Sequence, residues 1–382
     1  MDFALTEEQG AIFDMARAFA DEHIAPGAAE WDETGTLPVG VIRKTAELGM
    51  AGIYVREEHG GSALTRLDAT LIFEALSYGC PAVASFLSIH NMVAWMVDSF
   101  GSAEMRAEWI PKLTSMETMA SYCLTEPNSG SDAAALRTSA ARSNSGYVLN
   151  GAKAFISGGG ASDLYLVMAR TGGDGPKGIS TLLVENGTPG LSFGANEKKM
   201  GWKAQPTSVV QFDDCAVPAE NLVGEEGKGF AYAMMGLDGG RLNIAACSLG
   251  AAQNALDKAA RYMHERRAFG KTLADFQALQ FKLADMETEL QAARIFLRQA
   301  AWKLDTRAPD ATKFCAMAKR FVTDTGFRVA NEALQIHGGY GYLADYGVEK
   351  IVRDLRVHQI LEGTNEIMRV IVARHLLEEA KG

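Results

Sequence analysis

The sequence lacks the cysteine pattern of a disulfide-stabilised or zinc-binding domain. It has five cysteines, an odd number without any C-x-x-C spacing: Cys80, Cys123, Cys215, Cys247 and Cys315. Disulfide frameworks and zinc sites both depend on paired, closely spaced cysteines or histidines. We therefore expect reduced cysteines, mostly buried as small side chains, and no metal site.

Long apolar runs and clusters of basic residues are missing as well. No uninterrupted apolar stretch approaches the roughly 20 residues that a membrane-spanning helix requires. The net charge is -10, with 37 Lys and Arg against 47 Asp and Glu. Binding to DNA or RNA needs clustered Lys and Arg that contact phosphates. The sequence therefore predicts neither membrane insertion nor a nucleic-acid partner.

The composition is that of an ordinary globular enzyme. Apolar residues make up 47% and charged residues 22%, as in typical folded domains. The first nine residues, MDFALTEEQ, are acidic and do not have the basic and apolar regions of a secretory signal. We expect a bacterial cytoplasmic location. A chain of 382 residues exceeds the size at which one core keeps growing, so two or three packed domains are expected.

The sequence pattern changes twice along the chain and divides it into three segments. Residues 1–119 show apolar positions at helical spacing, residues 120–225 show short β-rich runs between Gly, Asn, Asp and Pro, and residues 226–382 return to helical spacing. We predict a multidomain α+β fold with an N-terminal helical domain, a middle, mostly antiparallel β-domain and a C-terminal helical domain. The longest helix is expected over about residues 275–304.

The first helix has recognisable start and stop signals. Thr6 and Gln9 have the spacing of a capping box. Pro26 and Gly27 are expected to end this helix.

Two short matches to known motifs are better explained as turns. Residues 173–178 (GDGPKG) match G-x-G-x-x-G, but a strand pattern rather than a helix follows. Residues 190–194 (GLSFG) match the nucleophile elbow, again without a following helix. Both segments are predicted to be structural parts of the β-domain.

Four longer motifs occur in order: YCLTEPNSGSD (122–132), ERRAFGK (265–271), QIHGGYGY (335–342) and QILEGTNEIMR (359–369). Together they resemble the signature stretches of the acyl-CoA dehydrogenase family over essentially the whole chain. Within the family these and other short stretches are most similar to the sequences of isobutyryl-CoA dehydrogenases. The resemblance implies the acyl-CoA dehydrogenase fold, with a C-terminal domain like a four-helix bundle, bound FAD and a homotetramer.

The resemblance also implies that Glu362 is the catalytic base. Removing a proton beside a thioester carbonyl needs a positioned carboxylate, and the β-hydride needs an electron-accepting cofactor. In the implied mechanism the hydride passes to flavin N5, while the Glu362 N–H and a ribityl hydroxyl polarise the carbonyl. Some relatives carry the base directly before Arg241, where this chain has Gly240. Without the family, a loop Glu such as this one is usually a solvated surface acid.

The residues implied to bind FAD form two groups, the second contributed across a subunit interface. The first group is Tyr122, Leu124, Thr125, Gly130, Ser131, Phe155 and Ser157. The second group is Arg266, Phe269, Gln277, Gln335, Gly338 and Gly339. Arg offers several donors to a phosphate, and Gly allows close approach of the backbone. Read alone, Arg266 would be a solvated helix end and Gln335 an ordinary helix residue.

Further flavin contacts are implied for Thr364 and Asn365. Acyl-CoA contacts are implied for Ser131, Asp238, Arg241 and Arg374. Many relatives have Trp and Thr where this chain has Phe155 and Ser157. Because Phe is also aromatic and Ser also carries a hydroxyl, the resemblance implies that ring stacking and the hydroxyl are retained.

The implied reaction is the α,β-dehydrogenation of isobutyryl-CoA to methacrylyl-CoA in valine degradation, with electrons passed to electron-transfer flavoprotein. A short straight-chain or 2-methylbutyryl-CoA dehydrogenase is an alternative. A flavin monooxygenase on the same fold and a non-catalytic flavoprotein also stay open, because a fold does not determine a function.

Overall fold

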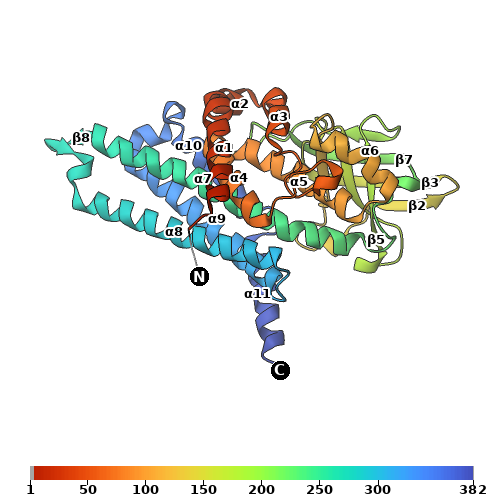
Figure 1. Cartoon of the computed structure of the whole chain (residues 1–382). Helices are drawn as coiled ribbons and strands as arrows, with labels where there is room; N and C mark the ends of the chain where they lie inside the picture. The colour runs from red at the N-terminus through yellow and green to blue at the C-terminus, as the bar shows by residue number, and fades with distance from the viewer. Residues whose placement is uncertain (1–3, 382) are drawn as a thin grey trace.

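The computed structural model describes residues 4–381 as a helical, a β-sheet and a second helical region in chain order (Figure 1). The first region contains α1 (Glu7–Phe19), α2 (Ala28–Thr34), α3 (Val39–Lys44), α4 (Arg66–Gly79), α5 (Pro81–Phe100) and α6 (Ala103–Thr114). The capping box at the start of α1 is confirmed, because the Thr6 side chain accepts from the Gln9 N–H and the Gln9 side chain accepts from the Thr6 N–H.

The expected stop of the first helix at Pro26 and Gly27 is wrong. α1 ends at Phe19, and the chain continues through a π-helical turn and a 3-10 turn into α2. Pro26 occupies one of the first two positions of the 3-10 turn. A proline is tolerated there because its missing N–H would have no partner inside the helix. The helical path therefore bends at this point and goes on.

The middle region is one curled sheet. Its strands are β1 (Ala120–Cys123), β2 (Ser139–Ser143), β3 (Gly146–Ser157), β4 (Leu164–Arg170), β5 (Ile179–Glu185), β6 (Leu191–Phe193) and β7 (Thr207–Pro218). The order is β1-β4-β2-β3-β7-β6, with β5 paired to β4. The β4 pairings to β1 and β2 are parallel and the others antiparallel, so the prediction of a mostly antiparallel sheet is confirmed.

Both rejected motifs are structural, as predicted. Residues 173–178 include a 3-10 turn (Pro176–Gly178) that leads directly into β5, and residues 190–194 contain the short strand β6. Neither segment opens a helix.

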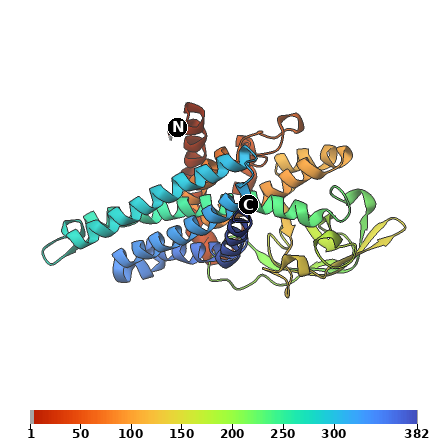
Figure 2. The same cartoon turned by 90° about the horizontal axis from the view of Figure 1, so that it is seen from below.

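The second helical region contains α7 (Gly229–Glu265), α8 (Gln277–Asp305), α9 (Ala311–His337), α10 (Val348–His358) and α11 (Asn365–Glu379), with a small hairpin of β8 (Arg267–Ala268) and β9 (Lys271–Thr272) after α7. Figures 1 and 2 show this hairpin at the end of the molecule opposite the sheet, and Figure 1 shows α11 projecting from the body.

The expectation that the longest helix covers residues 275–304 is wrong. In the described part of the chain α7 is longer than α8, with 37 residues against 29. α7 contains several glycines, which weaken a helix by about 1 kcal/mol each relative to alanine. Tertiary packing overrides that preference, because α7 is buried against α4, α5, α8 and α9.

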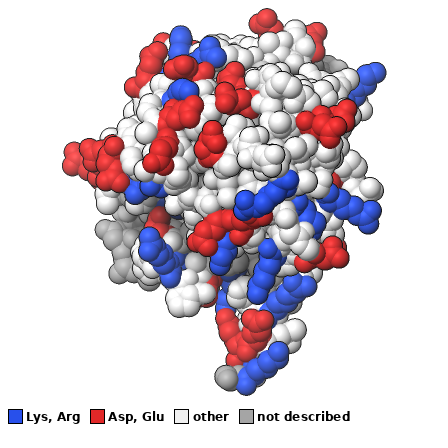
Figure 3. Space-filling model, turned by 90° about the vertical axis from the view of Figure 1, so that its right-hand side faces the viewer, with Lys and Arg blue, Asp and Glu red and all other residues white. Residues whose placement is uncertain are grey.

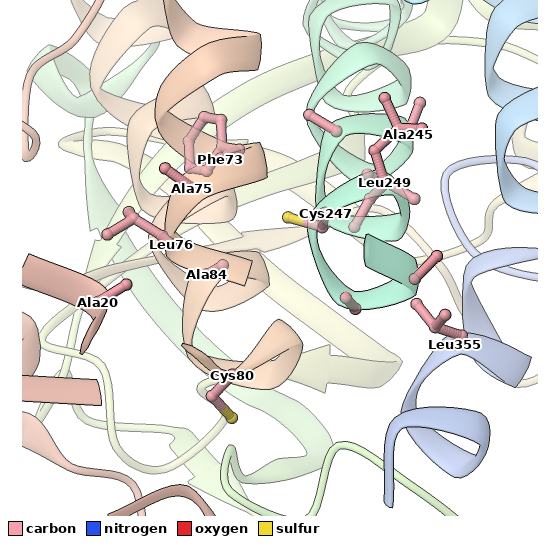
Figure 4. Close-up of a cluster of buried hydrophobic side chains, with 14 of the residues drawn as sticks. Ala20, Phe73, Ala75, Leu76, Cys80, Ala84, Ala245, Cys247, Leu249 and Leu355 are labelled. Atoms are coloured by element: carbon pink, nitrogen blue, oxygen red, sulfur yellow. The ribbon is translucent and has the colours of Figure 1, made fainter. Parts of the chain in front are cut away.

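The close contact of α4 with α7 forms the centre of the apolar core. Figure 4 shows Leu76 of α4, Cys247 of α7 and Leu355 of α10 in one buried cluster. The five cysteines are all buried and free, as predicted. The core runs across the regions, so the domain boundaries after residues 119 and 225 stay a prediction.

The surface carries both signs of charge. On the face seen in Figure 3, acidic and basic side chains of the described residues are interspersed. Within residues 4–381, no helix combines the length and apolarity needed to cross a membrane.

The α4–α7 contact yields a prediction about two glycines. A Cβ added at Gly250 would lie 1.9 Å from the Glu74 carbonyl oxygen, whereas one added at Gly10 in α1 would meet nothing within 4 Å. Gly250→Ala should force the two helices apart and cost about 1–3 kcal/mol. Gly10→Ala should stabilise by up to about 1 kcal/mol. Thermal unfolding measures both, and a Gly250→Ala protein as stable as Gly10→Ala would contradict this packing.

Candidate active site

Glu362 lies in the connection between α10 and α11, in an unusual backbone conformation. Its φ is 56°, and Gly363 follows with a φ of 85°. Positive φ is uncommon for a residue with a side chain, and such strain concentrates at functional sites. The turn directs the side chain inward, so that Oε2 is buried without a hydrogen-bond partner among the described residues. The reading of Glu362 as a solvated loop acid is therefore wrong.

Two buried cations hold this turn from different helices. From α7, Arg241 Nε donates to the Glu362 carbonyl oxygen (3.4 Å) and Nη1 donates to Asp238 Oδ1 (2.6 Å). From α9, Lys319 Nζ donates to the Gly363 carbonyl oxygen (2.8 Å). Arg241 is 4% exposed and Lys319 is 0% exposed. The turn is thus fixed through its main-chain oxygens, which leaves the carboxylate unpaired.

Burial raises the pKa of the Glu362 carboxyl to about 7, although the positive charges of Arg241 and Lys319 oppose the rise. A carboxyl with a pKa near neutrality can both accept and release a proton at physiological pH. This makes Glu362 suited to general-base chemistry.

Gly240 of α7 faces the Glu362 carboxylate. A Cβ at Gly240 would lie 2.6 Å from Glu362 Oε2, so the glycine leaves the space that the carboxylate occupies. The two positions that the resemblance implies for a base are therefore adjacent in space, and only Glu362 carries an acid.

Tyr122 of β1 contributes a second unpaired polar atom to this place. Its hydroxyl is buried with no partner among residues 4–381. Burial raises the pKa of the Tyr122 phenol well above its ordinary value, and the nearby negative charge of Glu362 raises it further. Buried polar groups are nearly always paired, so two unpaired ones beside each other indicate a site for a polar ligand.

The first group of predicted FAD residues lies at the junction of β1 and β3. The Ala154 N–H donates to the Thr125 carbonyl (2.8 Å), and the buried Lys153 donates to the Leu124 carbonyl (3.1 Å) and to Glu126 (2.8 Å). These bonds fix the segment that runs from β1 into the loop with Gly130 and Ser131, both of which are exposed.

Phe155 lies where the register of β3 with β7 shifts, with a φ of 57°. Its ring is 70% exposed. An aromatic face held out of the core in this way suits stacking on a flat cofactor ring. Ser157 lies two residues further along β3, and its carbonyl accepts from the Ser121 hydroxyl (2.6 Å).

The second group of predicted FAD residues lies beyond the end of α7. A cavity of about 480 Å³ is lined by Arg266, Gly338 and Gly339, together with Tyr340 and other neighbours. A Cβ on either glycine would meet nothing within 4 Å. Phe269 in the β8–β9 turn is 95% exposed. Gln277 at the start of α8 and Gln335 near the end of α9 are both exposed.

The two groups of predicted FAD residues lie at opposite ends of the molecule. The sheet with the first group and the β8–β9 hairpin with the second are separated by the length of the helical region in both views (Figures 1 and 2). One chain therefore does not bring all of these residues to a single cofactor. A shared site requires a second copy of the chain.

Asn365 and Thr364 have structural partners within the chain. The Asn365 amide accepts from Lys319 (2.9 Å) and donates to Thr323 (3.0 Å) and Asp324 (2.7 Å). Thr364 caps α11 by accepting from the Ile367 N–H (3.3 Å). Their flavin contacts stay predictions, which the main chain could make without disturbing these bonds.

The predicted substrate residues are only partly gathered. Asp238 pairs with Arg241 and accepts from the Thr312 hydroxyl (2.7 Å), next to the Glu362 turn. Ser131 lies in the exposed loop after β1, and Arg374 is exposed on α11. The sequence analysis missed Lys319, although a lysine on the buried face of α9 between Cys315 and Val322 was a visible signal.

Two features fit a flavin cofactor: the exposed Phe155 ring at the strand irregularity and the open, glycine-lined cavity beside Arg266. The buried Glu362 carboxyl with its raised pKa fits a proton transfer. This combination matches what the resemblance implies for a flavin-dependent oxidoreductase.

Comparison with known proteins specifies the family. The acyl-CoA dehydrogenase N-terminal, middle and C-terminal domains match residues 6–117, 121–215 and 227–377. Isobutyryl-CoA dehydrogenase, mitochondrial, from Bos taurus is 55% identical over 375 residues, which cover 98% of this chain and 90% of that protein.

Two solved structures are similar over almost their whole length. Butyryl-CoA dehydrogenase from Megasphaera elsdenii shares 40% identity with a TM-score of 0.95, covering 99% of this chain and 100% of that chain. The structure of PigA with FAD and proline shares 30% identity with a TM-score of 0.95, covering 98% and 99%. The chain belongs to the acyl-CoA dehydrogenase family, and it is an FAD-dependent acyl-CoA dehydrogenase.

The raised pKa of Glu362 predicts a pH-dependent gain in stability for Glu362→Gln. The folded pKa is about 7 against 4.5 ordinarily, so folding takes up a proton between these values and the stability contributed by Glu362 falls as pH rises through them. The variant should gain about 1–3 kcal/mol over wild type between pH 5 and pH 8. Melting temperatures of both FAD-bound proteins across this range measure the difference. A difference independent of pH would place the carboxyl in solvent.

Proposed function

We propose that Glu362 removes the α-proton of a short, branched acyl-CoA thioester, with isobutyryl-CoA as substrate and methacrylyl-CoA as product. The observation that carries the proposal is the inward-directed, unpaired Glu362 carboxylate with a pKa near 7. FAD, when bound, supplies the acceptor for the hydride from the β-carbon.

The surrounding side chains favour this role for Glu362. Arg241 and Lys319 hold the main chain of the turn and leave both carboxylate oxygens free of their hydrogen bonds. Gly240 keeps the space in front of Oε2 open. In the proposed mechanism the Glu362 N–H, which lies in the same turn, would donate to the thioester carbonyl and so acidify the α-proton.

The choice of a branched substrate rests on similarity to isobutyryl-CoA dehydrogenase at 55% identity. Such an enzyme would act in valine degradation. A short straight-chain substrate is the alternative, because the butyryl-CoA dehydrogenase similarity also extends over the whole chain. A 2-methylbutyryl thioester would need only one further methylene in the acyl pocket.

FAD binding would use both groups of predicted residues from different copies of the chain. Tyr122, Thr125 and Phe155 would contact the flavin part, and Arg266 and Gly338 of another copy the phosphates. Their separation within one chain favours a contribution from a second copy. The homotetramer is proposed from the resemblance to the family. Electron-transfer flavoprotein is the proposed acceptor of electrons. The bacterial cytoplasmic location stays a prediction.

Glu362→Gln should keep FAD and acyl-CoA binding but lose flavin reduction by at least about 100-fold, because an amide of nearly the same shape cannot accept the proton. Anaerobic bleaching of the flavin by isobutyryl-CoA measures the rate. Glu366→Gln, which removes a nearby acid whose side chain is 79% exposed, is the matched control and should bleach at the wild-type rate. Bleaching by Glu362→Gln at that rate would remove Glu362 as the base.

The proposed substrate requires a short acyl pocket, and such a pocket predicts a steep dependence on chain length. Isobutyryl-CoA should have the highest kcat/KM, 2-methylbutyryl-CoA and butyryl-CoA should follow, and octanoyl-CoA should be poor because extra methylenes clash. Single methylenes change discrimination by only about 1–3 kcal/mol, so octanoyl-CoA gives the sharper comparison. Faster turnover of octanoyl-CoA than of isobutyryl-CoA would disprove the short, branched substrate and leave the role of Glu362 intact.

A further inference from the structure

We propose that Lys319 is a positioning residue of the reaction, whose buried ammonium holds the Glu362–Gly363 turn and keeps the Glu362 carboxylate ionised until it receives the substrate proton. The proposal rests on the proposed role of Glu362.

Lys319 reaches the turn from the inner face of α9. Its side chain is fully buried, and Nζ donates to the Gly363 carbonyl oxygen (2.8 Å) and to Asn365 Oδ1 (2.9 Å). Both acceptors are neutral oxygens rather than carboxylates. The hydrogen bonds therefore orient the ammonium but do not neutralise its charge, which remains available to act on Glu362.

One of these bonds is made to the second residue of the strained turn and the other to a residue just after it. Gly363 has a φ of 85°, directly after Glu362 with 56°, and Asn365 begins α11. A conformation of this kind persists only where the surroundings over-determine it. Lys319 ties both ends of the Gly363–Asn365 segment to one rigid helix, so it fixes the direction in which the Glu362 side chain leaves the backbone.

Stability alone does not explain a lysine at this position. Taking an ammonium out of water is costly, and an apolar side chain of similar volume usually serves a core better. Burial lowers the pKa of Lys319 to about 7, and the negative charge of Glu362 counteracts the decrease. Each group therefore favours the charged form of the other.

The charged groups that act on Lys319 come from the turn itself, from α7, from α9 and from α11. Glu362 of the turn, Asp324 of α9 and Glu366 of α11 favour its charged form, whereas Arg241 of α7 opposes it. His358 at the end of α10 is held neutral, because burial and then the charge of Lys319 lower its pKa to about 3. Glu366 lies at the surface, so the Glu362 carboxylate is the buried counter-charge of Lys319.

The experiment replaces the ammonium by a side chain of similar shape. In Lys319→Met the pKa of Glu362 should rise by about one pH unit or more, the effect of losing a nearby opposite charge. Two measurements report the pKa of Glu362. The first is the infrared carbonyl band of its protonated carboxyl, which is identified by its loss in Glu362→Gln. The second is the decrease in the rate of flavin reduction toward low pH. If the pKa rises by one pH unit, flavin reduction below pH 7 should slow about tenfold and approach the wild-type rate at high pH.

Thr323→Val is the matched control. Thr323 lies one turn along α9 and accepts from the same Asn365 side chain (3.0 Å) but carries no charge. Both readouts should keep the wild-type midpoint in this variant. An unchanged Glu362 midpoint in Lys319→Met, or an equal change in Thr323→Val, would overturn the proposal.

Lys319→Gln, which keeps a donor without the charge, gives the same reading if Lys319→Met does not fold. Loss of the folded state in both variants would show a purely structural lysine and also overturn the proposal. A wrong assignment of Glu362 gives a different result. In that case Glu362→Gln would have the same carboxyl band and the same bleaching rate as the wild type.

Discussion

The left-handed turn at Glu362 and Gly363 is the constraint on which the active site depends. A carboxylate cannot be buried cheaply, and its unpaired state beside Tyr122 is costly in the free protein. The turn persists because Arg241 and Lys319 bind its carbonyl oxygens from two long helices. The rigid helices on both sides fix the direction of the Glu362 side chain. Proton transfer requires such fixed positions of the donor and acceptor atoms.

The helix α7 links this turn to the rest of the fold. Its glycines serve contacts that a side chain would block: Gly240 beside the Glu362 carboxylate and Gly250 against the α4 backbone. Its last residue, Glu265, leads to Arg266 and the cavity at the far end of the molecule. One buried helix therefore spans the molecule from the proposed site of proton transfer to the surface proposed to bind the cofactor of another copy.

The sequence predicted local features well where their signals are local. The capping box of Thr6 and Gln9 depends on residues three positions apart, and Glu362 lies in a long motif. The length of α7 was missed because its glycines indicate weak helix propensity, which burial on all sides overrides. The buried position of Lys319 has a local signal in α9. Its partners in the turn lie more than forty positions later, so these contacts have no signature in the residues near Lys319.

A structure of the FAD-bound protein with an unreactive isobutyryl-CoA analogue tests the account most directly. The account predicts that the Glu362 carboxylate lies within about 3.5 Å of the α-carbon of the analogue, with Arg241 and Lys319 still bound to the carbonyl oxygens of the turn. A Glu362 side chain directed away from the α-carbon, with another acid in its place, would contradict it.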